Sequence, residues 1–284
     1  MVPALDCGGK PLDLTRPCVM GILNTTPDSF SDGGLFLDVN AALEQARKMV
    51  RDGAAIIDVG GESTRPGAES VKADDELRRV IPVIEAIAAE LPVPISIDTS
   101  KPQVMRAAVA AGAGVINDVN ALRALGAMEA ARASGVPLCL MHMRGDPRRM
   151  QQEPVYRDVV GEVYEFLLRR VDACVAGGIS RSRLLLDPGF GFGKTLAHNL
   201  ALLRKLDRFL DADLPLLIGI SRKSMIGALL DKPVDQRLYG SLAAAVLAVQ
   251  AGATIVRVHD VGPTVDALRV ATAVMQDDSA MDNS

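Results

Sequence analysis

The chain contains eight short apolar runs, each ending in a polar or charged residue and each followed by a stretch of helical periodicity. Repeated strand-helix units have this pattern, because parallel strands buried on both faces consist almost continuously of Val, Ile and Leu. The runs span residues 19–24, 56–62, 94–98, 115–118, 138–142, 184–187, 214–221 and 254–259. Eight such units predict an α/β fold in the form of a single (β/α)8 barrel, a TIM barrel.

One barrel of about 250 residues would account for nearly all of the chain, which has 284 residues. We therefore expect a single domain. Residues 1–18 contain a Gly-Gly turn between short apolar pieces, which is typical of a hairpin, and we expect this hairpin to close the bottom of the barrel. The barrel would then span 19–276, and the small, acidic tail 277–284 is expected to be disordered.

Composition excludes several classes of partner. A formal net charge of −4 argues against nucleic acid, whose binding surfaces need clustered Lys and Arg. No apolar stretch is long enough to span a membrane, and the N-terminus has no signal-peptide pattern. Four cysteines without CxxC spacing suit buried thiols in a reducing compartment. We expect a cytoplasmic protein with no nucleic-acid or membrane partner.

Two of the helical stretches have clear boundaries. Thr99 or Ser100 is placed to cap a helix whose first turn holds Pro102, and this helix is expected to end near Gly112. Residues 159–175 carry one apolar face and are followed by two glycines, so they predict a second well-defined helix.

The C-terminal ends of barrel strands meet at one face of the fold, and function is expected there. The polar residues at these ends include Asn24, Asp98, Asn117, Asp187, Ser221, Lys223, Arg257 and His259. Three connections at the same face, 24–34, 60–70 and 143–154, are longer or more polar than a structural turn requires. Such loops commonly carry chemistry on a rigid scaffold.

Asp98, Asn117 and Asp187 end three different strands, after residues that should be buried. A buried carboxylate is costly unless paired, so each either meets an internal partner or accepts from a ligand. Two Asp oxygens match the planar N–H edge of a guanidine-like heterocycle, and an Asn amide can read an adjacent ring nitrogen. The alternative is a polar layer inside the barrel. Asp58, which precedes two further strand residues, is interpreted as structural.

A second group follows the last two strands. Residues 221–224 (SRKS) follow strand seven, and Arg257 and His259 end strand eight beside a helix start at 262–264. These loops form the usual phosphate site of the fold, because free helix N–H groups and basic side chains converge there. A solvated Arg-Lys pair is the alternative, but Arg257 alternates with valines in an apolar strand, which favours an anion site. His259 is suited to donating to a phosphate or to acid-base work.

The stretch 187–195 (DPGFGFGKT) is similar to a nucleotide-binding P-loop, but it has Pro188 where that motif requires glycine. We therefore reject the nucleotide interpretation. The glycines are interpreted as allowing the backbone to approach a flat ligand under Phe192, with Asp187 reading its edge.

Eight motifs resemble, in the same order, those of the dihydropteroate synthases, which are pterin-binding enzymes of the folate pathway. They are ILNTTPDSFSDGG, GGESTRPGA, SIDTSK, INDV, LMHM, DPGFGFGK, GISRKS and VRVHDV, and the resemblance runs from about Val19 to Met275. The resemblance implies condensation of 6-hydroxymethyl-7,8-dihydropterin diphosphate with p-aminobenzoate, giving 7,8-dihydropteroate and diphosphate. It also implies Mg²⁺ as cofactor and a homodimer of barrels.

The resemblance further implies roles for individual positions. It assigns pterin binding to Asp98, Asn117, Met141, Asp187, Phe192 and Lys223. It assigns the diphosphate to Thr64, Arg257 and His259, the magnesium ion to Asn24, and the border of the p-aminobenzoate site to Phe30, Arg65, Pro66 and Ser221. The implied catalytic set is Asp98, Lys223, Arg257 and His259. One departure is the connection 143–154, which is more basic than the family pattern.

The implied chemistry favours dissociative C–O cleavage. Magnesium, Arg257 and His259 would stabilise charge on the departing diphosphate, while Asp98 and Asp187 would lie beside a pterin cation. Two alternatives remain open. One is a pterin-binding methyltetrahydrofolate-corrinoid methyltransferase domain, in which the residues predicted to bind an anion would have no role. The other is a non-catalytic barrel that only binds a phosphorylated metabolite.

Overall fold

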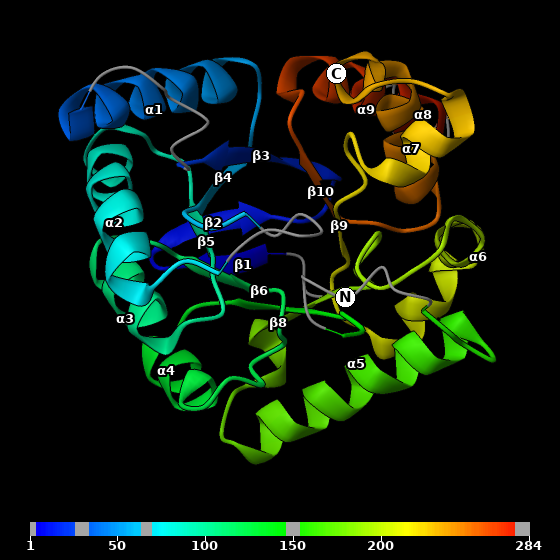
Figure 1. Ribbon diagram of the computed structural model, residues 1–284, viewed down its shortest axis with the longest axis horizontal. Coiled ribbons are helices and arrows are strands. Elements are labelled where there is room, and N and C mark those ends of the chain that lie inside the picture. The colour runs from blue at the N-terminus through cyan, green and yellow to red at the C-terminus, as the bar shows by residue number, and fades with distance from the viewer. Residues whose placement is uncertain (1–3, 26–33, 64–69, 146–153, 276–284) are drawn as a thin grey trace, which may run out of the picture.

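Eight parallel strands form the centre of the computed structural model and confirm the predicted fold class (Figure 1). They are β3 (Cys18–Asn24), β4 (Ile56–Gly60), β5 (Ile95–Asp98), β6 (Val115–Asp118), β7 (Leu138–Met141), β8 (Leu184–Asp187), β9 (Leu217–Ile218) and β10 (Ile255–Val258). The structure describes residues 4–25, 34–63, 70–145 and 154–275. Each of the eight predicted runs overlaps one of these strands.

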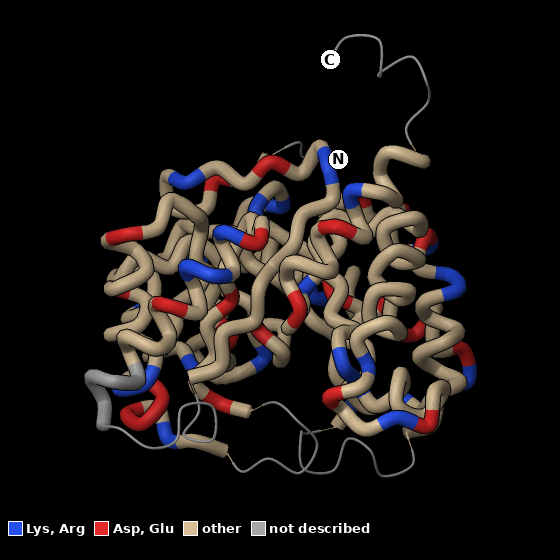
Figure 2. The backbone as a smooth tube through the Cα atoms, turned by 90° about the horizontal axis from the view of Figure 1, so that it is seen from above, with Lys and Arg blue, Asp and Glu red and all other residues tan. Residues whose placement is uncertain are grey.

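Helices surround the strands on the outside of the barrel (Figure 1). They are α1 (Gly34–Arg51), α2 (Ala73–Glu90), α3 (Pro102–Ala110), α4 (Ala127–Ser134), α5 (Val159–Ala176), α6 (Leu196–Arg204), α7 (Ser224–Leu230), α8 (Leu238–Gln250) and α9 (Val261–Met275). The positions of basic and acidic residues are interspersed along the chain (Figure 2). Within the described ranges, none of the helices has the length and apolarity needed to cross a lipid bilayer.

The barrel closes between its two outermost strands. The hydrogen-bonded order is β8-β7-β6-β5-β4-β3-β10-β9. A parallel bridge joins Leu186 of β8 to Leu216, just before β9, and the Leu186 N–H donates to the Pro215 carbonyl at 2.9 Å. This contact nearly closes the barrel and brings the eight C-terminal strand ends to one face.

Successive residues of each strand pack in two different places, as the two-residue period of a strand requires. One set packs against the surrounding helices and includes Ile57, Ile97, Ile116, Leu140, Leu186 and Val256. The other set packs inside the barrel and comprises Met20, Ile56, Val115, Cys139, Leu185, Leu217 and Ile255. Because both faces of every strand are buried, the strands appear in the sequence as nearly unbroken apolar runs.

An antiparallel hairpin of β1 (Ala4–Cys7) and β2 (Lys10–Asp13) covers the bottom of the barrel, as predicted. Its buried side chains Leu5 and Leu12 belong to the same apolar cluster as the inward-facing strand residues. The hairpin lies directly on Gly114, at the start of β6, where an added Cβ would be only 2.1 Å from the Cys7 carbonyl oxygen.

The predicted cap of α3 is wrong. Pro102 does occupy the first turn, but the N-cap residue is Lys101, which makes no side-chain cap bond. Ser100 instead donates through Oγ to Asp118 Oδ1 at 2.5 Å, and Thr99 Oγ1 accepts from the Lys101 N–H at 3.2 Å. Contacts with the neighbouring strand end therefore take precedence over local capping.

We predict that Gly114→Ala lowers the free energy of unfolding by about 1–3 kcal/mol, because the new methyl group must displace the hairpin backbone. Urea denaturation followed by circular dichroism would measure this loss. Gly262→Ala is the matched control, since its Cβ would meet no atom closer than 3.5 Å. Equal unfolding midpoints for the two variants would contradict the close packing of the hairpin on β6.

Candidate active site

The register of neighbouring strands aligns the predicted polar residues at the mouth of the barrel. Asn24 of β3 lies opposite Gly60 of β4, and Gly60 lies opposite Asp98 of β5. Asp98 in turn lies opposite Asn117 of β6. Parallel pairing therefore brings together side chains that are far apart along the chain.

A buried ion-pair network lies at the centre of this ring. Arg257 donates through Nε to Asp58 Oδ2 at 2.5 Å and through Nη2 to Asp98 Oδ2 at 2.8 Å. Its side chain is only 18% exposed, and that of Asp58 is fully buried. Burial opposes the charge of Arg257, but attraction to the two carboxylates outweighs this effect and raises the pKa of Arg257. Burial raises the pKa of Asp98 to about 7, although the attraction of Arg257 acts in the opposite direction.

Asp58, which was interpreted from the sequence as structural, belongs to this network. Asn117 also donates to Asp58 Oδ2, from Nδ2 at 3.3 Å. The sequence carried a usable signal. Asp58 lies two residues after inward-facing Ile56, just as Arg257 lies two residues after inward-facing Ile255. A strict two-residue period therefore places both side chains inside the barrel.

Two carboxylate oxygens of the network have no hydrogen-bond partner among the described residues. They are Asp58 Oδ1 and Asp98 Oδ1, both of them buried. A buried acceptor left without a donor costs about 1–3 kcal/mol. The Asp98 oxygen makes this side of the mouth suitable for a ligand that presents N–H donors.

Asp187 and Lys223 form the opposite side of the mouth. Asp187 is buried and accepts from the Gly189 N–H at 2.7 Å through Oδ1. Burial raises the pKa of Asp187, although the nearby Lys223 ammonium lowers it. Lys223 donates to the Phe190 carbonyl at 2.5 Å, and its Nζ lies 4.6 Å from the centre of the Phe192 ring. Burial lowers the pKa of Lys223 to about 8, against the attraction of Asp187.

Met141 and Phe192 share a small cluster of buried apolar side chains with Val119 and Met143. The strand register places Met141 opposite Asp187. The two predicted pocket-lining residues therefore lie beside the predicted carboxylate, and they provide an apolar surface for a flat ring.

The glycine-rich loop after β8 has a different role from the one predicted for its glycines. Gly189 and Gly193 have φ of +69° and +65°, a backbone conformation that residues with a side chain rarely adopt. A Cβ on Gly189 would lie 1.9 Å from the His142 carbonyl oxygen, and one on Gly193 would lie 2.3 Å from that of Arg144. These two glycines allow close packing against the loop after β7, so ligand approach is not needed to explain them.

Lys194 points into the protein and not toward a ligand. Its Nζ donates to the carbonyls of Gly189 at 2.7 Å and Phe192 at 3.1 Å, and it lies 2.9 Å from His142 Nδ1. Lys194 is only 2% exposed, and burial lowers its pKa well below the usual value. A P-loop lysine must reach phosphates, so this arrangement agrees with rejection of the nucleotide interpretation.

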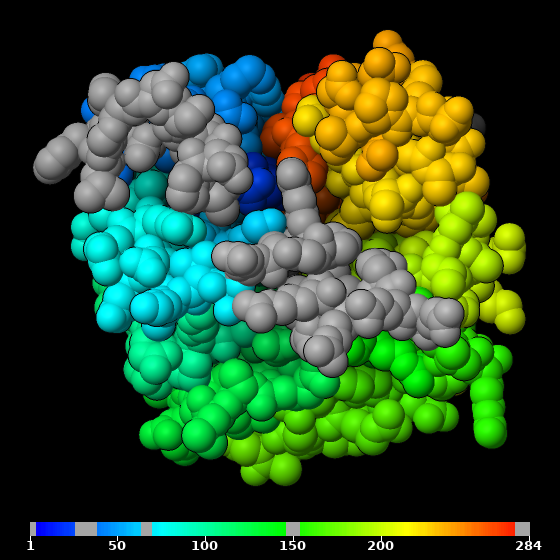
Figure 3. All heavy atoms as spheres, in the orientation of Figure 1, coloured from blue at the N-terminus to red at the C-terminus, as the bar shows by residue number. Residues whose placement is uncertain are grey.

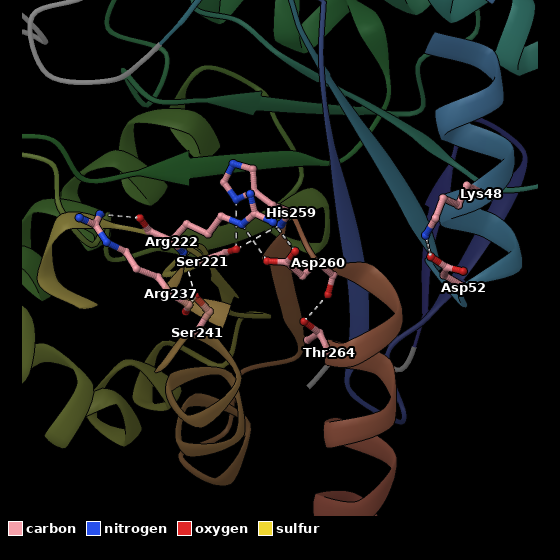
Figure 4. Close-up of polar contacts among 9 residues, drawn as sticks. All are labelled: Lys48, Asp52, Ser221, Arg222, Arg237, Ser241, His259, Asp260 and Thr264. Carbon is pink, nitrogen blue, oxygen red and sulfur yellow. Dashed lines mark hydrogen bonds and ion pairs between the residues drawn. The ribbon is translucent and has the colours of Figure 1, made fainter. Parts of the chain in front are cut away.

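The loop after β9 and the start of α9 are joined by several polar contacts (Figure 4). Ser221 Oγ lies 3.1 Å from His259 Nδ1 and accepts from the His259 N–H at 3.2 Å. Arg222 forms a two-pronged ion pair with Asp260, in which the Nε–Oδ2 distance is 2.9 Å. Thr264 Oγ1 donates to the Asp260 carbonyl at 2.7 Å. This network holds His259 beside a helix N-terminus, a position suited to an anion.

Asn24 reaches the same mouth. A Cβ on Gly60 would lie 3.8 Å from Asn24 Oδ1 and 3.7 Å from the Asp98 Cβ, so both side chains lie next to Gly60. Within the described ranges, no group of three or more His, Cys, Asp and Glu side chains is arranged to hold a metal.

Phe30, Thr64, Arg65 and Pro66 lie outside the described residues. The chain next to the last three is anchored by a cluster that sequence reasoning missed. Lys101 Nζ lies between Glu62 Oε2, at 2.5 Å, and the fully buried Glu76. Glu62 also accepts from the Val71 N–H at 2.9 Å, which ties together both ends of the connection 64–69.

The model of the family described as pterin binding enzyme matches residues 20–259. Among characterised relatives, the dihydropteroate synthase of Escherichia coli (strain K12) is 55% identical over 267 residues, covering 94% of this chain and 95% of that protein. The chain belongs to the dihydropteroate synthases of this family.

Solved structures of related proteins support the same family assignment. The Xanthomonas albilineans dihydropteroate synthase with 4-aminobenzoic acid has a TM-score of 0.92 and 53% identity, covering 98% of this chain and 100% of that chain. The same enzyme in complex with 7,8-dihydropteroate has a TM-score of 0.88 and 50% identity, covering 97% of this chain and 100% of that chain.

The charge of Lys223 generates a pH prediction. A lysine is charged below its pKa, and because that pKa is lowered to about 8, the mouth loses a positive charge as pH rises from 7 to 9. We expect the dissociation constant of a dihydropterin diphosphate, measured by calorimetry, to rise by up to about tenfold per pH unit above 8. Lys223→Arg keeps its charge and should show a flat profile. Equal slopes in both proteins would contradict the assignment.

Proposed function

We propose that the chain condenses 6-hydroxymethyl-7,8-dihydropterin diphosphate with p-aminobenzoate to form 7,8-dihydropteroate and diphosphate. The carrying observation is the mouth of the barrel, where the buried carboxylate of Asp98, one oxygen of which has no partner among the described residues, lies next to the guanidinium of Arg257. The first feature suits a donor-rich heterocycle, and the second suits a diphosphate. The Xanthomonas albilineans complexes with 4-aminobenzoic acid and with 7,8-dihydropteroate support the same substrate and product.

The pterin would bind between the two carboxylate sides of the mouth. Its amino group and adjacent ring N–H form a planar donor edge, which matches the acceptors of Asp98, Asn117 and Asp187. Met141 and Phe192 would contact the ring face, and Lys223 would reach the ring from beside Phe192. The polar groups would fix the orientation of the ring, while the apolar contacts contribute burial.

The diphosphate would bind at Arg257 and His259. A guanidinium has five N–H groups, and Asp58 and Asp98 accept from two of these in Arg257, which leaves three for an anion. Free N–H groups at the start of α9 favour negative charge at the same place. Thr64, Phe30, Arg65, Pro66 and Ser221 complete the proposed diphosphate and p-aminobenzoate contacts.

The proposed reaction breaks the bond between the exocyclic methylene carbon and the diphosphate oxygen and forms a bond from that carbon to the arylamine nitrogen. Arg257 and His259 stabilise the charge that develops on the leaving diphosphate. Asp98 and Asp187 lie beside the electron-poor pterin, which favours a dissociative course. The arylamine is neutral at pH 7 and loses a proton after attack, so no strong base is required.

Magnesium is part of the proposal, with Asn24 as its protein ligand. Mg²⁺ commonly takes only one or two protein oxygens and completes its shell with phosphates and water. The Asn24 amide oxygen, which like Asp98 lies next to Gly60, fits that donor set. When bound, the ion would neutralise charge on the diphosphate.

We predict diphosphate release only when pterin diphosphate, p-aminobenzoate and magnesium are all present, measured by a coupled phosphate assay. Asn24→Ala should raise the magnesium concentration for half-maximal rate by about tenfold or more, because it removes one oxygen ligand. Asn40→Ala, on the exposed surface of α1, is the matched control. Absence of release with both substrates would favour a corrinoid-dependent methyltransferase domain or a non-catalytic barrel.

A homodimer is also part of the proposal, with α7 and α8 as the interface. Helix α8 contains no Asp, Glu, Lys or Arg, although it lies on the outside of the barrel. Tyr239 and Leu247 on α8 are 76% and 52% exposed, and Leu229 at the end of α7 is also exposed. The segment containing these helices forms a broad outer surface, yellow to orange in Figure 3. An uncharged helix face of this kind suits a second copy of the same surface.

We expect a solution mass near twice the 30.0 kDa of one chain by light scattering. The double substitution Tyr239→Glu and Leu247→Glu should give a monomer, because it would bury charges in the interface. Val175→Glu, at an exposed apolar position on α5, should leave the mass unchanged. A wild-type mass of one chain would exclude the dimer.

The proposed location is the cytoplasm. The cysteines of the chain, Cys7, Cys18, Cys139 and Cys174, are all free thiols. Unpaired thiols are typical of a reducing compartment, which supports this assignment.

A further inference from the structure

Asp58 contacts one residue from each half of the mouth through a single oxygen. Its Oδ2 accepts from Arg257 Nε at 2.5 Å and from Asn117 Nδ2 at 3.3 Å. Arg257 belongs to the proposed diphosphate subsite and Asn117 to the proposed pterin subsite. No other side chain in the described part of the chain has a hydrogen bond to both of these residues.

The charge of Asp58 determines how the Asn117 amide is oriented. An ionised carboxylate only accepts hydrogen bonds, so it requires the amide nitrogen of Asn117 on its own side. The Asn117 carbonyl oxygen and the second amide N–H are then presented to a ligand in a fixed arrangement. The reversed amide would place two acceptors against each other, and the Asn117 oxygen would meet no donor on that side. Asp58 therefore sets the hydrogen-bonding pattern that a heterocycle must match.

Asp58 also fixes the plane of the Arg257 guanidinium. Asp58 accepts from Nε and Asp98 accepts from Nη2 at 2.8 Å, so two nitrogens of the group are held. Without these contacts, the several rotatable bonds of an arginine side chain would have to be ordered when the ligand binds, at a cost in conformational entropy. Two buried carboxylates remove that cost before an anion arrives.

A purely structural role does not account for Asp58. The residue two positions earlier on the same face is Ile56, and the interior below consists of apolar side chains. A buried charge in such a place costs more than an apolar residue of similar size, and Asp58 Oδ1 lacks a partner among the described residues.

We propose that Asp58 is a positioning residue that preorganises both substrate subsites at once, by orienting Asn117 toward the pterin and Arg257 toward the diphosphate. This inference rests on the proposed function. It adds a residue that acts through two others and does not itself contact the reacting atoms.

The test compares Asp58→Asn with Asp118→Asn. Asp118 is the matched control, since it is also fully buried, but it accepts from Ser100 and from the N–H groups of Asn120 and Leu122. Calorimetry would measure binding of 6-hydroxymethylpterin and, separately, of inorganic diphosphate. Asp58→Asn should weaken each by about tenfold or more. Asp118→Asn should lose thermal stability and bind both ligands as the wild type does.

A double substitution separates positioning from general loosening of the barrel. In an Asn117→Ala background, Asp58→Asn should cost much less pterin affinity than in the wild type, because that effect acts largely through Asn117. Its effect on inorganic diphosphate should remain, because it acts through Arg257. If Asp58→Asn does not fold, the smaller Asp58→Ser replaces it, with the same expectations.

Wild-type affinities in a folded Asp58→Asn or Asp58→Ser protein would overturn the proposal, and so would additive losses in the pterin cycle. These outcomes differ from failure of the proposed function. In that case the wild-type protein itself would not release diphosphate from the two substrates.

Discussion

The structure depends on how the barrel accommodates the guanidinium of Arg257 in its interior. A charge removed from water in this way must be paired, and Asp58 and Asp98 supply the pairing from two adjacent strands. Two carboxylates on one guanidinium exceed what charge balance requires, and the second oxygen of each lacks a partner among the described residues. The polar layer is therefore incomplete by itself. It is arranged for a ligand that brings N–H donors to the carboxylates and negative charge to the arginine.

Barrel topology makes this arrangement possible. Asp58 and Arg257 are 199 positions apart in the chain, yet their strands both pair with β3. Parallel register places side chains of equal parity at similar heights, and closure through Leu186 and Leu216 completes the ring. The apolar layer below, covered by the N-terminal hairpin, supports the polar layer and excludes water from beneath it. The lower, apolar layer of strand side chains therefore contributes stability, and the polar layer above it carries the groups of the site.

Much of the site was visible in the sequence because strand period and strand ends are local properties. The polar ends Asp98, Asn117 and Asp187 were predicted from residues next to them, and the structure brings all three to one mouth. Asp58 was missed because its partner Arg257 comes from a strand at the other end of the chain. The glycines of the loop after β8 were misinterpreted for the same reason, since the backbone they contact belongs to the loop after β7.

The sequence by itself determined the eight strand-helix units, the end of the barrel where the polar strand ends gather and the family to which the chain belongs. These follow from periodicity, from strand ends and from motifs, all of which are encoded by residues close together. Only the tertiary structure decided which charges pair, which way Asn117 turns and that Lys194 is buried under its own loop. These contacts depend on how far each group is removed from water and on the distances between side chains of different strands. Both are set only when the barrel has formed.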